Sequence, residues 1–150
     1  MEKYNTLIIS GGGMKAISSL GALKYFEENK IINNFKTFIG VSAGATVSYL
    51  LSIGYKSDEL TEIITKIKPS EILNNNFENF FTNMGIFDIK DIIELIDSIS
   101  KQKNTTVKCT FKEHYKKYKI KLKIIGTNLT DLKSECFSYK TTPDMEIFKA

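Results

Sequence analysis

Two short runs of apolar, mostly β-branched residues near the N-terminus each lead through glycines into a helical pattern. The first run, Thr6–Ser10, is followed at once by glycines at 11–13, and apolar residues then recur with helical spacing. The second run, Thr37–Ile39, enters residues 40–44, beyond which residues 45–53 form a largely apolar segment of helical length. Short apolar strands that alternate with helices are typical of parallel sheets. The pattern therefore predicts two consecutive strand–turn–helix units.

The rest of the chain continues this alternation. The sequence first predicts a helix that begins at Ser57 and ends by Pro69, and then an amphipathic helix that begins at Asp88 and carries Ile89 to Ile99. A short helix with a capping box from Thr110 to Glu113 follows. After it, the sequence predicts a strand over Lys119–Asn128, a strand over Glu135–Tyr139 and a helix opened by Thr142-Pro143-Asp144. Helices between strands indicate the α/β class. We expect a three-layer α/β/α fold with a mostly parallel sheet and helices on both faces, as a single domain over residues 1–150.

Length and composition agree with one packed domain. The chain has 150 residues and a mass of 17.0 kDa, with 42% hydrophobic and 25% charged residues. No apolar stretch approaches the ~20 residues that cross a bilayer. The first residues, Met1 to Asn5, lack the basic start and long apolar middle of an export signal. The sequence therefore predicts an intracellular, cytoplasmic protein.

The charge pattern argues against a nucleic-acid partner. The formal net charge is +4, but all 21 basic residues are lysines. Arginine is the side chain that recognises phosphate and guanine through paired hydrogen bonds, so a dedicated nucleic-acid reader without it would be unusual. The two cysteines, Cys109 and Cys136, are too far apart for a C-x-x-C motif. In an intracellular protein we expect them to be reduced and mostly buried thiols.

The first candidate for chemistry is a G-x-S-x-G motif at the junction of the second strand and its helix. It reads Gly40-Val41-Ser42-Ala43-Gly44. In this context the serine occupies a sharp turn that exposes its hydroxyl, and the helix N-terminus behind it favours the negative charge that develops in acyl transfer. The alternative is a serine that caps an ordinary helix beside packing glycines.

The second candidate is the glycine loop after the first strand, Gly11-Gly12-Gly13. In a parallel sheet its amides and the serine emerge at the same edge, where free N–H groups can form an oxyanion hole. Lys15 either holds this loop and adds positive charge or is simply solvated. Gly11, Gly13 and Ala16 also fit the dinucleotide fingerprint G-x-G-x-x-A. That alternative requires an acidic residue at the end of the second strand, where this chain has Val41 and Ser42 instead.

The chain resembles the patatin-like phospholipases at these two places. In that family a G-G-G-x-[KR]-G loop forms the oxyanion hole, G-x-S-x-G carries the nucleophile, and the Asp of a later Asp-Gly-Gly or Asp-Gly-Ala completes a Ser/Asp dyad. The segment Gly11-Gly12-Gly13-Met14-Lys15 matches the loop, and Gly40 to Gly44 matches the serine motif, although Ala16 replaces the final glycine of the loop. The resemblance implies that Ser42 is the nucleophile, that the amides of residues 11–13 hold the oxyanion, and that no metal or cofactor takes part.

The base is the part that the sequence does not supply. The only histidine, His114, lies in a lysine-rich stretch that predicts a solvated helix end rather than a catalytic position. The aspartates of the chain, none of which is followed by glycine, are Asp58, Asp88, Asp91, Asp97, Asp131 and Asp144. The sequence is thus either part of a longer frame that contains the dyad Asp or a remnant with impaired catalysis.

The resemblance implies hydrolysis of a phospholipid or another lipid ester, of the phospholipase A or lysophospholipase type. The alternative is a lipid-binding or interaction module that descends from such an enzyme. We expect no nucleic-acid or dinucleotide partner. Two groups of residues could contact lipid. We expect Phe77, Phe80 and Phe81 to lie in the core rather than in a lid. We expect the lysines of 112–123 to be solvated, and the alternative is peripheral binding to anionic lipid.

Overall fold

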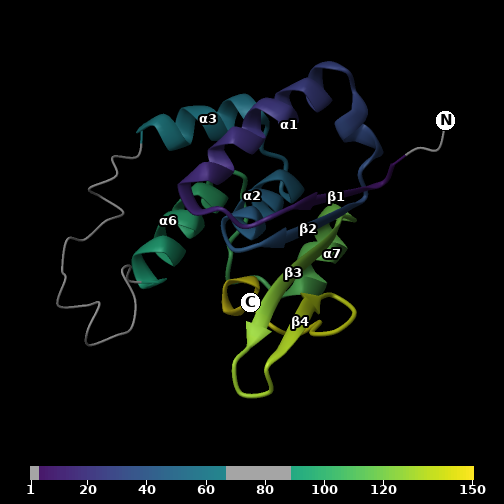
Figure 1. The fold of residues 1–150 in the computed structure, drawn as a ribbon, viewed down its shortest axis with the longest axis vertical. Coiled ribbons are helices and arrows are strands. Elements are labelled where there is room, and N and C mark those ends of the chain that lie inside the picture. The colour runs from purple at the N-terminus through teal and green to yellow at the C-terminus, as the bar shows by residue number, and fades with distance from the viewer. Residues whose placement is uncertain (1–3, 67–88) are drawn as a thin grey trace.

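A computed structural model describes residues 4–66 and 89–150 of the chain (Figure 1). In chain order, with η for a 3-10 helix, the elements are β1 (Thr6–Ile9), η1 (Gly13–Ser18), α1 (Ser19–Glu28), η2 (Ile31–Asn34), β2 (Thr37–Val41), α2 (Ala43–Ser52), α3 (Ser57–Lys66), α6 (Ile89–Lys101), α7 (Phe111–Tyr118), β3 (Lys121–Asn128), β4 (Lys133–Ser138) and η3 (Ile147–Lys149). The two predicted strand–turn–helix units are present, and both strands that follow the region 89–118 are confirmed.

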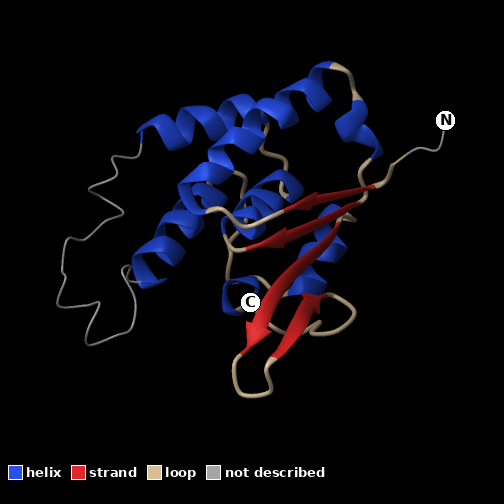
Figure 2. Ribbon diagram, in the orientation of Figure 1, coloured by secondary structure: helices blue, strands red, loops and turns tan. Residues whose placement is uncertain are grey.

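The strands form one mixed sheet in the order β1-β2-β3-β4 (Figure 2). β1 pairs with β2 and β2 with β3 in parallel, whereas β4 pairs with β3 in an antiparallel hairpin. The hairpin turn is held by Asn128, whose side-chain oxygen accepts hydrogen bonds from the backbone N–H of Thr130 and Asp131. The predicted α/β class with a mostly parallel sheet is confirmed.

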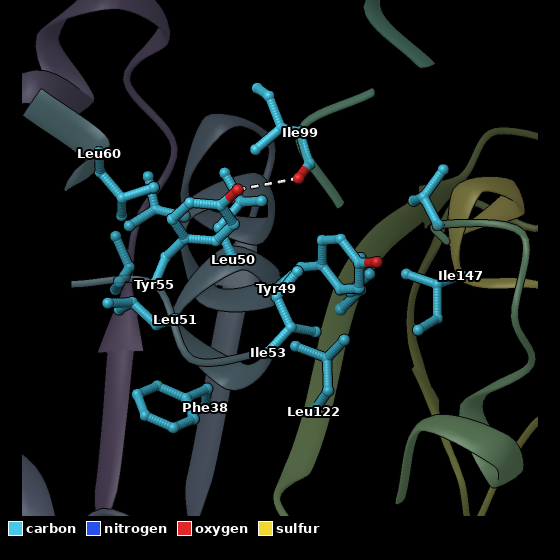
Figure 3. Packing of buried hydrophobic residues seen from close by; sticks show 14 of the residues in the cluster. Phe38, Tyr49, Leu50, Leu51, Ile53, Tyr55, Leu60, Ile99, Leu122 and Ile147 are labelled. Carbon is cyan, nitrogen blue, oxygen red and sulfur yellow. Dashed lines mark hydrogen bonds between the residues drawn. The ribbon is translucent and has the colours of Figure 1, made fainter. Parts of the chain in front are cut away.

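The core lies between the sheet and α2. On the sheet it is formed by Phe38 and Leu122, which are neighbours across β2 and β3. α2 is buried along most of its length, and its Tyr49 is 2% exposed, in agreement with the apolar helix predicted there. α6 closes the core from the far side, where the Tyr55 hydroxyl donates a hydrogen bond of 2.8 Å to the carbonyl of Ile99 (Figure 3).

The opposite face of the sheet is more open. Ile8 of β1 points to that face, because it lies between Leu7 and Ile9 in the alternation of the strand, and it is 67% exposed. The helix packing that the structure describes, chiefly that of α2, lies on the face of Phe38 and Leu122. The predicted second layer of helices has no counterpart within residues 4–66 and 89–150.

The short helix α7 confirms its predicted capping box. The Thr110 side chain accepts a hydrogen bond from the Glu113 N–H, and the Glu113 carboxylate accepts one from the Thr110 N–H. The charged residues Lys112, Lys116 and Lys117 are exposed, as expected for solvated lysines. Both cysteines are free thiols of intermediate exposure rather than mostly buried.

The helix predicted after Thr142 is wrong. Residues 141–145 form turns and bends, and Glu146 forms an isolated bridge with Thr110. The backbone N–H groups of Phe111 and Lys112 donate to the carbonyls of Met145 and Pro143. These donors belong to the first turn of α7, whose N–H groups have no acceptor within the helix. The segment after Thr142 supplies carbonyl acceptors to this turn and does not form another α-helix. The expectation for Phe77, Phe80 and Phe81 lies outside the described residues. Among the described helices, none has the length and apolar character that a membrane span requires.

Candidate active site

The parallel pairing of β1 and β2 brings the glycine loop and the serine motif to one edge of the sheet. The register runs from Thr6 opposite Thr37 to Ile9 opposite Gly40. Both strands run in the same direction and end beside the N-terminus of α2 (Figure 1). Chain segments that follow parallel strands therefore meet here, as in other open α/β sheets whose ligands bind at the carboxyl ends of the strands.

Ser42 occupies a strained turn between β2 and α2. Its φ is 54° and its ψ is −129°, close to the first central position of a type II′ turn, which glycine usually takes. The Ser42 carbonyl accepts the first helical hydrogen bond, from the N–H of Ala45 at 2.8 Å. A residue with a Cβ in this conformation costs about 1–3 kcal/mol, so the rest of the fold must hold it there.

The Ser42 side chain does not cap the helix that follows it. Its hydroxyl makes no capping hydrogen bond to the first turn of α2, and the residue is exposed. A serine that caps a helix has an extended backbone and accepts from the second or third helical N–H. The alternative of a capping serine is therefore wrong, and the hydroxyl is left available to a ligand.

Gly40 and Gly44 are needed because the backbones of three elements cross at this point. A Cβ on Gly40 would lie 2.4 Å from the Ala45 Cα, and one on Gly44 would lie 2.3 Å from the carbonyl oxygen of Ile9. Both of these atoms belong to the backbone, so they cannot move aside as the end of a flexible side chain can. The two flanking glycines of the motif thus let α2 start directly against β1 and β2, and this packing holds Ser42 in its turn.

The glycine loop lies against Ser42. A Cβ built on Gly11 would lie 3.3 Å from the Ser42 Cβ and 3.4 Å from the Val41 carbonyl oxygen. Gly11, Gly12 and Gly13 are all exposed. Outside helices and strand ladders, the described residues supply no backbone acceptor for their amides. The loop therefore places its N–H groups, for which the described residues supply no such acceptor, at the same edge of the sheet as the hydroxyl.

The residues after this loop brace it. Gly13 has a φ of 53°, a left-handed conformation that favours glycine, and begins η1. The Lys15 N–H donates to the Gly12 carbonyl at 3.0 Å, which closes the turn. The Lys15 side chain is exposed. Met14 and Lys15 are thus part of the 3-10 helix η1 that follows the loop. Ala16, which replaces the final glycine of the motif, lies in the same helix.

His114 is not the solvated residue that the sequence predicts. It is 1% exposed, and its Nε2 lies 2.8 Å from the Ser52 Oγ. Burial lowers the pKa of His114 to about 4, so the ring is neutral near pH 7. Ser52 ends α2 and Ser42 precedes it, and ten residues of helix separate the two by ~15 Å. His114 is therefore a buried core residue and not a base for Ser42.

A cavity of about 220 Å³ opens beside Ser42. Its lining residues, which come from α2, α6, β3, the loop before α7 and the last residues of the chain, are Ser42, Ala45, Thr46, Tyr49, Ile92, Ile93, Ile96, Val107, Ile124, Ile125, Ile147, Phe148 and Ala150. The sequence did not single out this set, because its members are brought together only by the packing of α6 and η3 around α2. An exposed hydroxyl, a glycine loop against it and an apolar cavity together suit attack on an ester with a hydrocarbon part.

The loop before α7 is anchored to α6 by a buried carboxylate. Asp97 accepts hydrogen bonds from the Thr106 hydroxyl and the Val107 N–H, and it forms a 2.8 Å ion pair with Lys101. The Lys101 ammonium and the Thr106 hydroxyl hold the pKa of Asp97 below its ordinary value. Because Val107 lines the cavity, Asp97 positions one of its walls.

The family model for patatin-like phospholipases matches residues 7–150. The chain is 35% identical over 152 residues to a protein named probable lipid hydrolase 463L, from Invertebrate iridescent virus 6, which covers 98% of this chain and 51% of the relative. It is 34% identical over 153 residues to the uncharacterized protein R571 of Acanthamoeba polyphaga mimivirus, with 99% of this chain and 50% of that protein covered. The chain thus spans about half the length of the curated relatives that it matches.

Solved structures share the fold. VipD from Legionella pneumophila matches with a TM-score of 0.68 and 19% identity over 99% of this chain and 41% of its own. ExoU, in its heterodimeric complex with SpcU from the type III secretion system of Pseudomonas aeruginosa, matches with a TM-score of 0.67 and 20% identity over 98% of this chain and 35% of its own. At this identity the likeness concerns the fold.

Proposed function

The chain belongs to the patatin-like phospholipase family, and on this premise we propose that it carries the nucleophile and the oxyanion hole of a lipid acyl-ester hydrolase. Ser42 is the nucleophile, and the amides of Gly11, Gly12 and Gly13 bind the oxyanion. The observation that carries the proposal is the strained, exposed and uncapped Ser42 with the glycine loop against it.

In the proposed reaction, the Ser42 Oγ attacks the ester carbonyl and its proton passes to a base. The carbonyl oxygen becomes an anion and accepts hydrogen bonds from the loop amides, and the N-terminus of α2 adds a favourable dipole. Collapse of the tetrahedral intermediate breaks the ester C–O bond, and the base returns its proton to the leaving oxygen. The alcohol or lysolipid departs, and the acyl group stays on Ser42. Water, activated by the same base, then releases the fatty acid.

The base in this proposal is an aspartate outside residues 1–150. Among the described aspartates, Asp58 pairs with Lys24 at 2.9 Å, and Asp97 is buried and held by Thr106 and Lys101. A carboxylate engaged in this way is not free to take a proton from Ser42. A general base contributes roughly 10²–10⁴ in rate, so hydrolysis by residues 1–150 alone would be slow.

A fluorophosphonate probe tests the proposal, because it reacts with serines that are activated as nucleophiles. We expect the full-length protein to be labelled on Ser42, and the Ser42→Ala variant to lose the label together with ester hydrolysis. Ser134→Ala, in an exposed position of β4, is the matched control and should keep both. A folded full-length protein that is not labelled, or one that hydrolyses lipid esters equally well after Ser42→Ala, contradicts the proposal. Liposome binding without any turnover would favour the lipid-binding alternative.

A further inference from the structure

The cavity beside Ser42 runs along one side of α2. Ser42, Thr46 and Tyr49 all line it, and their spacings of four and three residues place them on one face of the helix. Seven residues of α helix extend over ~10 Å. The cavity therefore leads away from the hydroxyl as a trough, and it is not a shallow bowl around it.

The walls of the trough are hydrocarbon. Ile92, Ile93 and Ile96 line it from α6, and Ile124 and Ile125 line it from the end of β3. None of the lining side chains carries a charge, and the polar ones among them are Ser42, Thr46 and the phenol of Tyr49. A phosphate or sugar headgroup would lose its hydration here without new partners, whereas an alkyl chain would gain by leaving water.

The far end of the trough is closed by a fixed side chain. The Tyr49 hydroxyl donates a 3.1 Å hydrogen bond to the Ser100 Oγ, and Ser100 donates in turn to the Ile96 carbonyl at 2.7 Å. The ring of His114 packs behind Tyr49, with 6.1 Å between centroids. Because Ser100 is fully buried and Tyr49 is 2% exposed, this end does not open to solvent. Ile96 lies one turn before Ser100 on α6, accepts the Ser100 hydrogen bond and also lines the cavity.

We propose that this trough holds the acyl chain of the ester that Ser42 attacks, and that Ile96 and Tyr49 set the longest chain that fits. The inference rests on the proposed function, since it takes Ser42 as the nucleophile. It adds that the acyl part enters the protein while the alcohol part stays outside, and it assigns chain-length selection to two residues of α6 and α2.

The test is a chain-length series of p-nitrophenyl esters, from butanoate to hexadecanoate, with the full-length protein. Ile96→Trp fills the trough and should lower the ratio of kcat/KM for dodecanoate to kcat/KM for butanoate by roughly tenfold or more. Ile96→Ala widens the trough and should shift the optimum to longer chains. Leu95→Ala and Leu95→Trp are the matched controls, because Leu95 is the adjacent, partly buried residue of α6 that does not line the cavity.

The outcomes separate this inference from the proposed function. Butanoate hydrolysis that depends on Ser42, with the same chain-length profile in both Ile96 variants as in the wild type, overturns the inference and leaves the proposed function standing. Equal profile shifts in the Ile96 and Leu95 variants also overturn it, since they would indicate a general effect on α6.

Binding provides a readout that does not need turnover. Calorimetric titration of the Ser42→Ala protein with dodecanoate should show saturable binding, which the additional change Ile96→Trp weakens roughly tenfold and Leu95→Trp does not. If no ester is hydrolysed but this pattern holds, the proposed function fails and the acyl site stands. If dodecanoate does not bind, or binds equally well after Ile96→Trp, the acyl site is wrong.

Discussion

Replacing Ser42 by glycine should stabilise the protein while it removes the proposed nucleophile. With a φ of 54° and a ψ of −129°, Ser42 carries a Cβ in a conformation that costs about 1–3 kcal/mol and that glycine adopts freely. Glycine also makes the unfolded chain more flexible, which offsets about 0.4–1 kcal/mol of this gain. Since the Ser42 side chain makes no capping bond, little else is lost. We therefore expect Ser42→Gly to raise the free energy of unfolding by about 1 kcal/mol relative to Ser42→Ala, which keeps the Cβ.

Urea denaturation of the two variants measures this difference as a shift in midpoint at constant slope. The matched control is the same pair of changes at Ser98, an exposed residue of the regular helix α6, where glycine should be less stable than alanine by about 1 kcal/mol. The sign of the difference should thus be opposite at the two sites. If Ser42→Gly is less stable than Ser42→Ala, as at Ser98, then Ser42 is not strained and the main evidence for the nucleophile turn fails.

Three further outcomes can be measured in the same way. Gly44→Ala should lower the free energy of unfolding by about 1–3 kcal/mol through its clash with backbone, whereas Gly21→Ala, in α1 with open space around it, should raise it by up to about 1 kcal/mol; equal effects would contradict the backbone crossing. The buried His114 should make the protein less stable as the pH falls from 6.5 toward 4, because its folded pKa of about 4 lies below its unfolded value. Between pH 7 and pH 5 the free energy of unfolding of the wild type should fall by about 2 kcal/mol, whereas that of His114→Gln should not show this loss. Asp97→Asn should cost about 1–3 kcal/mol, because it weakens the bonds to Thr106 and Val107; an unchanged urea midpoint would mean that this carboxylate does not anchor the loop.

The parts of the site that could be predicted from the sequence are those that form between neighbouring segments. The glycine loop and the serine turn follow two consecutive strands, so parallel pairing alone brings Gly11 within contact of Ser42. The burial of His114 was missed because the lysines around it suggested a solvated helix. A signal was present, since Phe111, His114 and Tyr118 are spaced as one face of a helix, and the two aromatic residues pack against the core.

Other features depend on contacts that no local pattern contains. Thr142 and Pro143 have the sequence of a helix start, but the first turn of α7 offers unpaired N–H groups to that segment and draws it into turns. The cavity likewise joins residues of α2 to residues of α6 and η3 that lie about 50 and 100 positions further along the chain. Hydrophobic periodicity predicted that α6 would be a packing helix, but it could not indicate that part of its apolar face is left open beside Ser42.

The turn that holds Ser42 and the α6 wall of the cavity are structurally separable, and this has a consequence for the proposed substrate selection. The close contacts that Gly40 and Gly44 require are made with β1 and with the first turn of α2. Two of the walls share these elements, since Ala45 packs against Gly40 and Ile124 lies opposite Gly40 in the sheet. The wall that α6 supplies, with Ile92, Ile93 and Ile96, makes none of the close contacts that the two glycines require. Substitutions on α6 can therefore change the shape of the trough without loosening Ser42 or the glycine loop. In a site built this way, the proposed chain-length preference can change through α6 while the sheet keeps the turn that holds Ser42.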